Sequence, residues 1–195
     1  MNAVTIQVGL PERFRRAAAE LFYQSFRQKG QFFLGAPPAG VAILEHDLCA
    51  EQAVVARQAD RLVGVAGIQH QRRPFLAVRL RTYLAALGVI EGVLRFGAAC
   101  LAVRPYRDGE LLMDGIAVDE AVRGQGVGTK LLNGVIEFAR EHGYQTVRLD
   151  VVDTNPRARQ LYERLGFVAT RTQRLPIKRE WLGFTASTTM IKTLS

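Results

Sequence analysis

The chain has 195 residues, of which 48% are hydrophobic and 23% charged, and its formal net charge is +8. This length predicts one domain over residues 1–195 with one sizeable core. Cys49 and Cys100 are too few and too isolated for a disulfide framework or a metal site, so a reducing, cytoplasmic location is expected. Lysines and arginines are scattered without a basic helix, so we expect no nucleic-acid partner. The first residues lack the pattern of a secretory signal.

The chain is predicted to open with a strand and a helix. Val4 to Val8 alternates apolar and polar side chains, which is typical of a half-buried strand. Pro11 favours the first position of a helix, because its missing N–H would have no partner there. The side chains of this helix that are expected to face the core are Phe14, Ala17, Ala18, Leu21, Phe22 and Phe26.

A loop, a second helix and a β-hairpin are predicted next. Gly30 to Gly40 contains two adjacent prolines and is predicted to be a loop, whereas Val41 to Cys49 predicts a helix. Ala53 to Gln58 and Leu62 to His70 predict two strands that are joined by the turn at Ala59-Asp60.

The segment from Arg72 to Asp108 is strongly apolar and is about as long as two helices with their connections. Phe75 to Ala86 and Val89 to Val103 predict a pair of amphipathic helices. Charged side chains interrupt both stretches, so no membrane span is expected. The pair could wall a substrate pocket, form a homodimer face, touch a membrane surface or cover a sheet edge, and the sequence leaves these roles open.

A glycine-rich turn lies between a buried strand, predicted from Leu111 to Val118, and a helix, predicted from Thr129 to His142. The turn is Arg123-Gly124-Gln125-Gly126-Val127-Gly128. Glycines let a ligand approach the backbone closely, and the first N–H groups of a helix favour an anion. We therefore expect a phosphate site here, although the spacing fits neither a P-loop nor a dinucleotide fingerprint.

Strands and helices alternate through the rest of the chain. Thr146 to Val152 predicts a strand, and Asn155 to Leu165 predicts a helix that Asn155 caps and Pro156 begins. Two last strands are expected near Phe167 to Arg174 and Phe184 to Lys192. Together these elements predict a mixed α/β layer fold.

Four features between Glu110 and Ala169 agree in order and spacing with one known family. They are the strand that ends in Ile116-Ala117-Val118-Asp119, the loop with Arg123, Gly126 and Gly128, the Asn155-Pro156 pair, and Leu161-Tyr162-Glu163 before Leu165-Gly166-Phe167. This region resembles the GNAT superfamily of acetyl-CoA-dependent N-acetyltransferases. The resemblance implies a central twisted, mostly antiparallel sheet flanked by helices. The helix pair predicted within residues 72–108 does not fit a minimal member of the family and would be an insertion before the central strand.

The resemblance also implies acetyl-CoA as co-substrate, with no metal, and a primary amine of a small molecule, protein or peptide as acceptor. Loop amides would bind the pyrophosphate, and Asn155 would contact the pantetheine or the acyl region. The expected cofactor-binding residues are Ile116, Ala117, Val118, Arg123, Gly124, Gln125, Gly126, Val127, Gly128, Thr129, Asn155 and Tyr162. Another acyl-CoA, another acceptor, or a non-catalytic acyl-CoA-binding module are the alternatives.

Acetyl transfer to an amine needs a base for the amine and an acid for the leaving thiolate. The resemblance makes Tyr162 the expected acid, because the family commonly carries a tyrosine at this position. A phenol with a pKa of about 10 is protonated at neutral pH and can donate. The resemblance makes Asp114 and Glu110 the candidate bases, because family members carry acidic residues at these distances before the residue matching Arg123. On a regular strand both would share a face. We prefer Asp114, since a carboxylate in an apolar strand is costly unless paired or used. A water relay without a dedicated base is the third alternative. We further expect part of Val78 to Val103 to line an apolar acceptor pocket.

Overall fold

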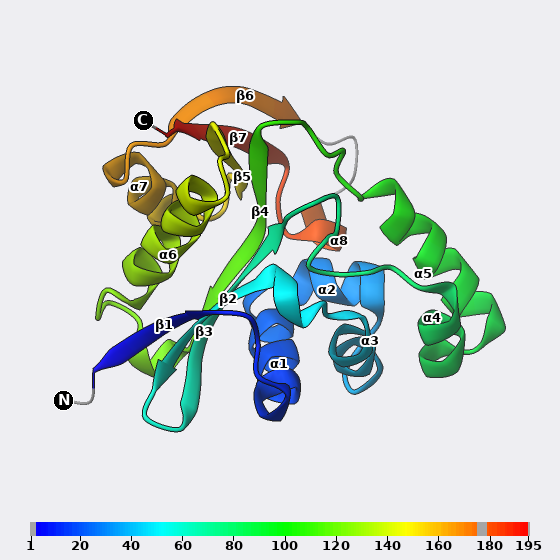
Figure 1. Ribbon diagram of the computed structural model, residues 1–195. Helices are drawn as coiled ribbons and strands as arrows, with labels where there is room; N and C mark the ends of the chain where they lie inside the picture. Colours follow the sequence, from blue (N-terminus) through cyan, green and yellow to red (C-terminus); the bar gives the residue numbers. More distant parts are fainter. Residues whose placement is uncertain (1–2, 175–178, 195) are drawn as a thin grey trace.

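A seven-stranded sheet runs through the molecule, with helices on both of its faces (Figure 1). The computed structural model describes residues 3–174 and 179–194. Their strands are β1 (Val4–Val8), β2 (Ala53–Gln58), β3 (Arg61–Gln69), β4 (Glu110–Val118), β5 (Thr146–Val152), β6 (Val168–Arg174) and β7 (Ala186–Thr193). Their α-helices are α1 (Arg15–Ser25), α2 (Arg27–Leu34), α3 (Ala39–Asp47), α4 (Leu80–Leu87), α5 (Val89–Leu101), α6 (Val127–Glu141), α7 (Pro156–Arg164) and α8 (Arg179–Leu182).

The strand order is β1-β2-β3-β4-β5-β7-β6, and every neighbouring pair is antiparallel except β4 and β5. The predicted mixed α/β fold with a mostly antiparallel sheet is therefore confirmed. The parallel pair is short, because only Glu110 to Leu112 pair with Thr146 to Arg148. Beyond that point β4 and β5 are no longer paired with each other, and the sheet opens between them.

The two faces of the sheet carry different helices. Helix α6 buries Leu131, Leu132 and Val135 against one face, together with inward residues of β4 and β5 such as Leu111 and Leu149. Helices α1 to α5 lie on the opposite side in Figure 1, and a second apolar cluster fills the space between them and the sheet. The alternation of side chains along β4 thus separates an apolar face under α6 from a face that carries charged residues.

The predicted loop from Gly30 to Gly40 is confirmed only for Gly35 to Pro38, because α2 continues through Gly30 to Leu34 and α3 begins at Ala39. Glycine serves close packing here. A Cβ at Gly30 would lie 3.3 Å from the Tyr23 ring, and one at Gly40 would lie 2.5 Å from it. The Tyr23 hydroxyl donates a hydrogen bond of 2.7 Å to the carbonyl oxygen of Gly35. The glycines therefore make room for a buried tyrosine between α2 and α3.

Two smaller predictions about the helices are also wrong. The helix expected from Phe75 begins only at Leu80, because the Phe75 ring is buried over Gly67, where a Cβ would come within 2.2 Å of it. Ala17 is exposed, and Ala19 takes the buried position next to Ala18. The short helix α8 was not expected from the sequence.

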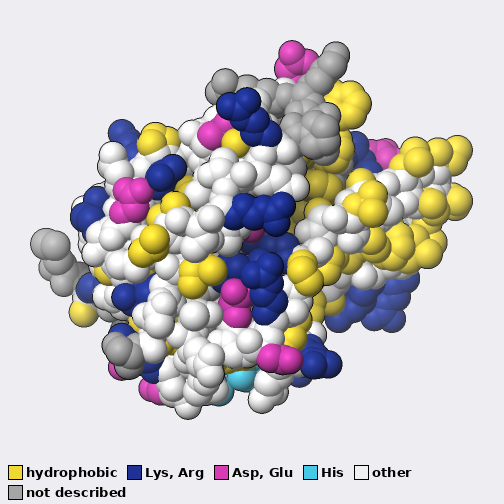
Figure 2. Space-filling model, turned by 90° about the horizontal axis from the view of Figure 1, so that it is seen from above, with side chains coloured by type: hydrophobic (Ala, Val, Ile, Leu, Met, Phe, Trp, Pro, Cys, Tyr) yellow, Lys and Arg dark blue, Asp and Glu magenta, His cyan; other side chains and the backbone are white. Residues whose placement is uncertain are grey.

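The insertion forms the predicted helix pair, α4 and α5, at one side of the molecule (Figure 1). In the part of the chain that the structure describes, no helix is both long and apolar enough to span a bilayer. Figure 2 shows hydrophobic side chains gathered on this protruding part. Val89, Ile90 and Leu94 of α5 are 73%, 80% and 69% exposed. The homodimer face expected as one role of the insertion stays a prediction.

Candidate active site

The glycine turn lies directly before α6, and its backbone requires glycine at two positions. Gly124 and Gly126 both have φ of 79°, in the left-handed region, and no atom lies within 4 Å of where their Cβ atoms would stand. Gly126 occupies the N-cap position without a side-chain cap. The amides of Val127, Gly128 and Thr129 therefore begin the helix without acceptors inside it. Open space beside free N–H groups and the positive end of a helix dipole suits a phosphate.

Three elements meet at this turn. A Cβ on Gly128 would lie 3.4 Å from Leu161 of α7 and 3.9 Å from Val118 at the end of β4. Arg123 points back to β4, since its Nε donates a hydrogen bond of 3.2 Å to the carbonyl oxygen of Val118. The loop, the end of β4 and α7 thus surround one site.

The edge of β4 continues this site towards the middle of the sheet. Ile116, Ala117 and Val118 pair with β3 on one side, at Ala66, Val65 and Gly64. On the other side no described strand pairs with them, because the pairing with β5 ends at Leu112. An extended ligand that leaves the glycine turn has an open strand edge to follow.

Helix α7 begins and packs as its sequence predicts. The Asn155 side chain accepts a hydrogen bond of 3.1 Å from the amide of Ala158, and Pro156 is the first helical residue, which confirms the predicted cap. Tyr162 is only 5% exposed and packs near Phe167, with ring centroids 6.0 Å apart. Burial raises the pKa of the Tyr162 hydroxyl to about 12.

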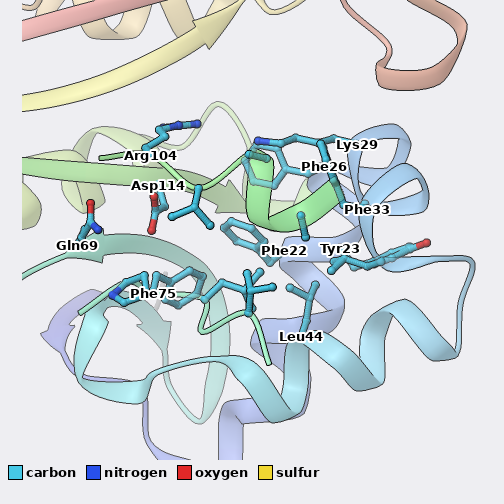
Figure 3. A pocket seen from close by; sticks show the side chains of 18 of the residues that line it. Phe22, Tyr23, Phe26, Lys29, Phe33, Leu44, Gln69, Phe75, Arg104 and Asp114 are labelled. Carbon is cyan, nitrogen blue, oxygen red and sulfur yellow. The ribbon is translucent and has the colours of Figure 1, made fainter. Parts of the chain in front are cut away.

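A cavity of about 170 Å³ lies on the face of the sheet opposite α6, between α1, α2, the insertion and the sheet (Figure 3). Most of its wall is apolar. Its charged or amide-bearing side chains are Lys29 from α2, Gln69 from β3, Arg104 from the end of the insertion, and Asp114 from β4. Val78, Tyr83, Ala99 and Val103 also line it, so the insertion does wall this cavity.

Asp114 owes its place to a β-bulge. Gly67 pairs with Gly115 and Ile68 with Met113, so Asp114 is the extra residue on β4. Bulges commonly redirect a side chain next to an active site. Burial raises the pKa of the Asp114 carboxyl, although nearby positive groups, Arg104 above all, lower it in part.

The other candidate base, Glu110, stands in a different setting. Its carboxylate lies 2.5 Å from Nε of Arg148, and both side chains are buried. Arg107 lies 4.0 Å away on the exposed side of the pair. Glu110 is not among the residues that line the cavity. Only Asp114 of the two carboxylates reaches the cavity.

The sequence reasoning missed two cations in this cavity. Burial, and secondly the charge of Arg104, lowers the pKa of the Lys29 amine to about 8. Arg104 itself forms an ion pair with Asp150 of β5, with Nε 3.3 Å from the carboxylate. The sequence does show Lys29 as a single lysine between Phe26 and Phe33, which could have indicated a cation at an apolar site. It was missed because a loop was predicted to begin at Gly30.

The model of the acetyltransferase (GNAT) family matches residues 16–167, which is most of the chain. The chain belongs to the GNAT acetyltransferase family. It is therefore an acyltransferase of the kind that the strand, loop and helix pattern predicted.

Relatives of known sequence carry acetyltransferase names. Thialysine N-epsilon-acetyltransferase from Bos taurus is 29% identical over 126 residues, which are 64% of this chain and 71% of that protein. Probable N-acetyltransferase camello from Xenopus tropicalis is 38% identical over 81 residues. That match spans 41% of this chain but only 37% of the relative's length.

Solved structures agree in fold. An N-acetyltransferase from Staphylococcus aureus Mu50 aligns with a TM-score of 0.68 at 20% identity, over 96% of this chain and 100% of its own. YncA, a putative acetyltransferase from Salmonella typhimurium with its cofactor acetyl-CoA, aligns with a TM-score of 0.65 at 18% identity, over 100% of this chain and 95% of its own. At these identities the similarity concerns the fold.

Proposed function

We propose that this chain transfers an acetyl group from acetyl-CoA directly to a primary amine, as one catalytic domain over residues 1–195. The observation that supports this most is the open edge of β4, which runs from the glycine turn at one end to the Asp114 cavity at the other. A donor with a pyrophosphate and an extended arm fits the first part, and a small amine fits the second.

The residues around the turn fit coenzyme A. The amides from Gly124 to Thr129 would hold the pyrophosphate, because they combine open space with the N-terminus of α6. Among them the amide of Gln125 already donates a hydrogen bond to the carbonyl oxygen of Val122. The unpaired edge at Ile116 to Val118 would hold the pantetheine arm by backbone hydrogen bonds. Asn155 would keep its capping bond and still present its amide to the arm. The donor supplies an acetyl group activated as a thioester.

Asp114 and Tyr162 would manage the protons. As the amide C–N bond forms and the thioester C–S bond breaks, Asp114 accepts the proton that the amine loses, and Tyr162 donates one to the leaving thiolate. Burial makes the Asp114 carboxylate a stronger base than an exposed one. With a pKa of about 12, Tyr162 is fully protonated at neutral pH. Glu110 is the second candidate base, although its ion pair with Arg148 occupies it.

The donor site can be tested with a matched pair of glycine variants. Gly126→Val places a branched side chain in the turn, and Gly143→Val does the same at the far end of α6. Both glycines have positive φ, 79° and 73°, and open space around them. The two variants should therefore lose similar stability, on the order of 1–2 kcal/mol. In isothermal titration only Gly126→Val should lose acetyl-CoA binding. Unchanged binding by a folded Gly126→Val protein would refute the loop assignment.

A further inference from the structure

Several polar groups at the cavity are buried without the partners that burial demands. Nη1 of Arg104 and Oε1 of Gln69 are buried, and neither has a hydrogen-bond partner among the described residues. Gln69 is itself only 8% exposed. A buried polar group that makes no hydrogen bond is costly, so these two atoms point to a ligand in the cavity.

The two cations of the cavity face the same space. Figure 3 shows the amine of Lys29 and the guanidinium of Arg104 pointing towards each other across the top of the pocket, with Asp114 below them. Lys29 makes no ion pair within the described part of the chain, and the pairing of Arg104 with Asp150 leaves Nη1 free. Two neighbouring, partly buried cations favour an anion between them, and charge-assisted bonds to a carboxylate would satisfy both.

The rest of the wall is of a different character. Phe22, Phe33, Leu44 and Phe75 line the part of the cavity away from Arg104 (Figure 3). Gln69 pairs with Leu112 in the β3–β4 register, two residues before Asp114, and the side chains of Gln69 and Asp114 both line the cavity. The cavity therefore offers two hydrogen-bond acceptors, Asp114 and Gln69, together with a pair of cations and an apolar wall.

We propose that the acceptor is a small amine that carries both a carboxylate and an apolar body, such as an apolar or aromatic amino acid. Lys29 and Arg104 bind its carboxylate, Asp114 and Oε1 of Gln69 receive its amine, and the phenylalanines surround its side chain. This inference rests on the proposed acetyl transfer and names its acceptor class. A peptide N-terminus is disfavoured, because an uncharged amide replaces the carboxylate that the two cations require.

A matched series of acceptors tests the inference. Phenylalanine, phenylalaninamide and phenethylamine share the amine and the ring and differ only in the carboxylate, and leucine, methionine and tryptophan with their amides extend the series. Thiol release gives kcat/KM for each compound. We expect each acid to exceed its amide by about tenfold or more, as for a hydrogen bond to a charged group. The α-amine of an amino acid amide is less basic than that of the acid, so a larger fraction of it is uncharged at neutral pH. A difference in basicity alone would therefore favour the amide as acceptor.

Variants connect the preference to the two cations. Lys29→Met should reduce the ratio of acid to amide to near one. Arg81→Met, at an exposed arginine of the insertion, should leave the ratio unchanged. Arg104→Met should also lower the ratio, and Arg104→Lys should restore part of it. The inference would be overturned if the amides or phenethylamine had the same kcat/KM as the acids, or if Lys29→Met kept the full preference for the acids. Either result would leave the proposed acetyl transfer intact. No acetylated product from any amine, despite acetyl-CoA binding, would overturn the proposed function and the inference with it.

Discussion

Replacing Lys29 by methionine should stabilise the folded protein at neutral pH. The amine has a pKa of about 8 in the folded state, against 10.5 for an unperturbed lysine, because burial and the charge of Arg104 disfavour its charged form. At about 1.4 kcal/mol for each pKa unit, this difference corresponds to about 3 kcal/mol of lost stability. Methionine fills similar space without a charge, so the variant should recover up to that amount.

The pH dependence gives the prediction its sign. Because the folded pKa lies below the unfolded one, the penalty is fully present below pH 8 and fades as the pH rises from about 8 towards 10.5. Asp114 and Asp150 also act on Lys29 and offset the penalty in part, and their effect is already contained in this pKa.

Thermal unfolding of the parent and of Lys29→Met at a series of pH values measures the effect. At pH 7 the midpoint of thermal unfolding should rise by roughly 6–12 °C, given about 2–4 °C per kcal/mol for a chain of this size. The gain should shrink between pH 8 and 10. Lys130→Met, at an exposed lysine, should change stability by no more than about 0.5 kcal/mol. A Lys29→Met protein that is no more stable than the parent at pH 7, or whose gain is independent of pH, would refute the reasoning.

Three further substitutions test the catalytic groups and the cap. Tyr162→Phe should lower kcat by roughly ten- to ten-thousand-fold with little change in acetyl-CoA affinity. Tyr144→Phe, the control, should leave kcat near the parent value. If Tyr162→Phe also kept the parent kcat, Tyr162 would be a packing residue. Asp114→Asn should reduce kcat/KM most and remove the acid limb of its pH profile, which the raised pKa of Asp114 places above the usual carboxyl range. Glu110→Gln should instead cost mainly stability, roughly 3 kcal/mol, by breaking a buried ion pair; the reverse order of activities would assign the base to Glu110. Asn155→Ala should lower the unfolding free energy by about 1 kcal/mol, and no change would contradict the capping bond.

Local patterns in the sequence were sufficient for the donor side of the site. The positions of β4 and α6 and the cap at Asn155 follow from side-chain periodicity and from glycine and proline, which act within a few residues. Asp114 was also recognisable, because a carboxylate inside an apolar strand demands a reason.

The acceptor side was not predictable in the same way. Lys29, Arg104 and Asp114 come from three separate segments, and only packing of α2 and the insertion against β4 brings them to one cavity. Gly30 misled the prediction because a glycine required by close packing has the same local signature as one that ends a helix. The bulge that turns Asp114 into the cavity has no signature in β4 alone, since it depends on the register with β3.

Acetyl transfer itself is tested most directly by measuring acetylated amine and free coenzyme A thiol in the same reaction, with mass spectrometry for the amine. The proposed function predicts one acetylated amine for each thiol released, for at least one apolar amino acid. It also predicts that Gly126→Val abolishes both products and that Gly143→Val preserves them. Thiol release without acetylated amine, or transfer that survives in Gly126→Val, would contradict an acetyltransferase site built on the glycine turn and the open edge of β4.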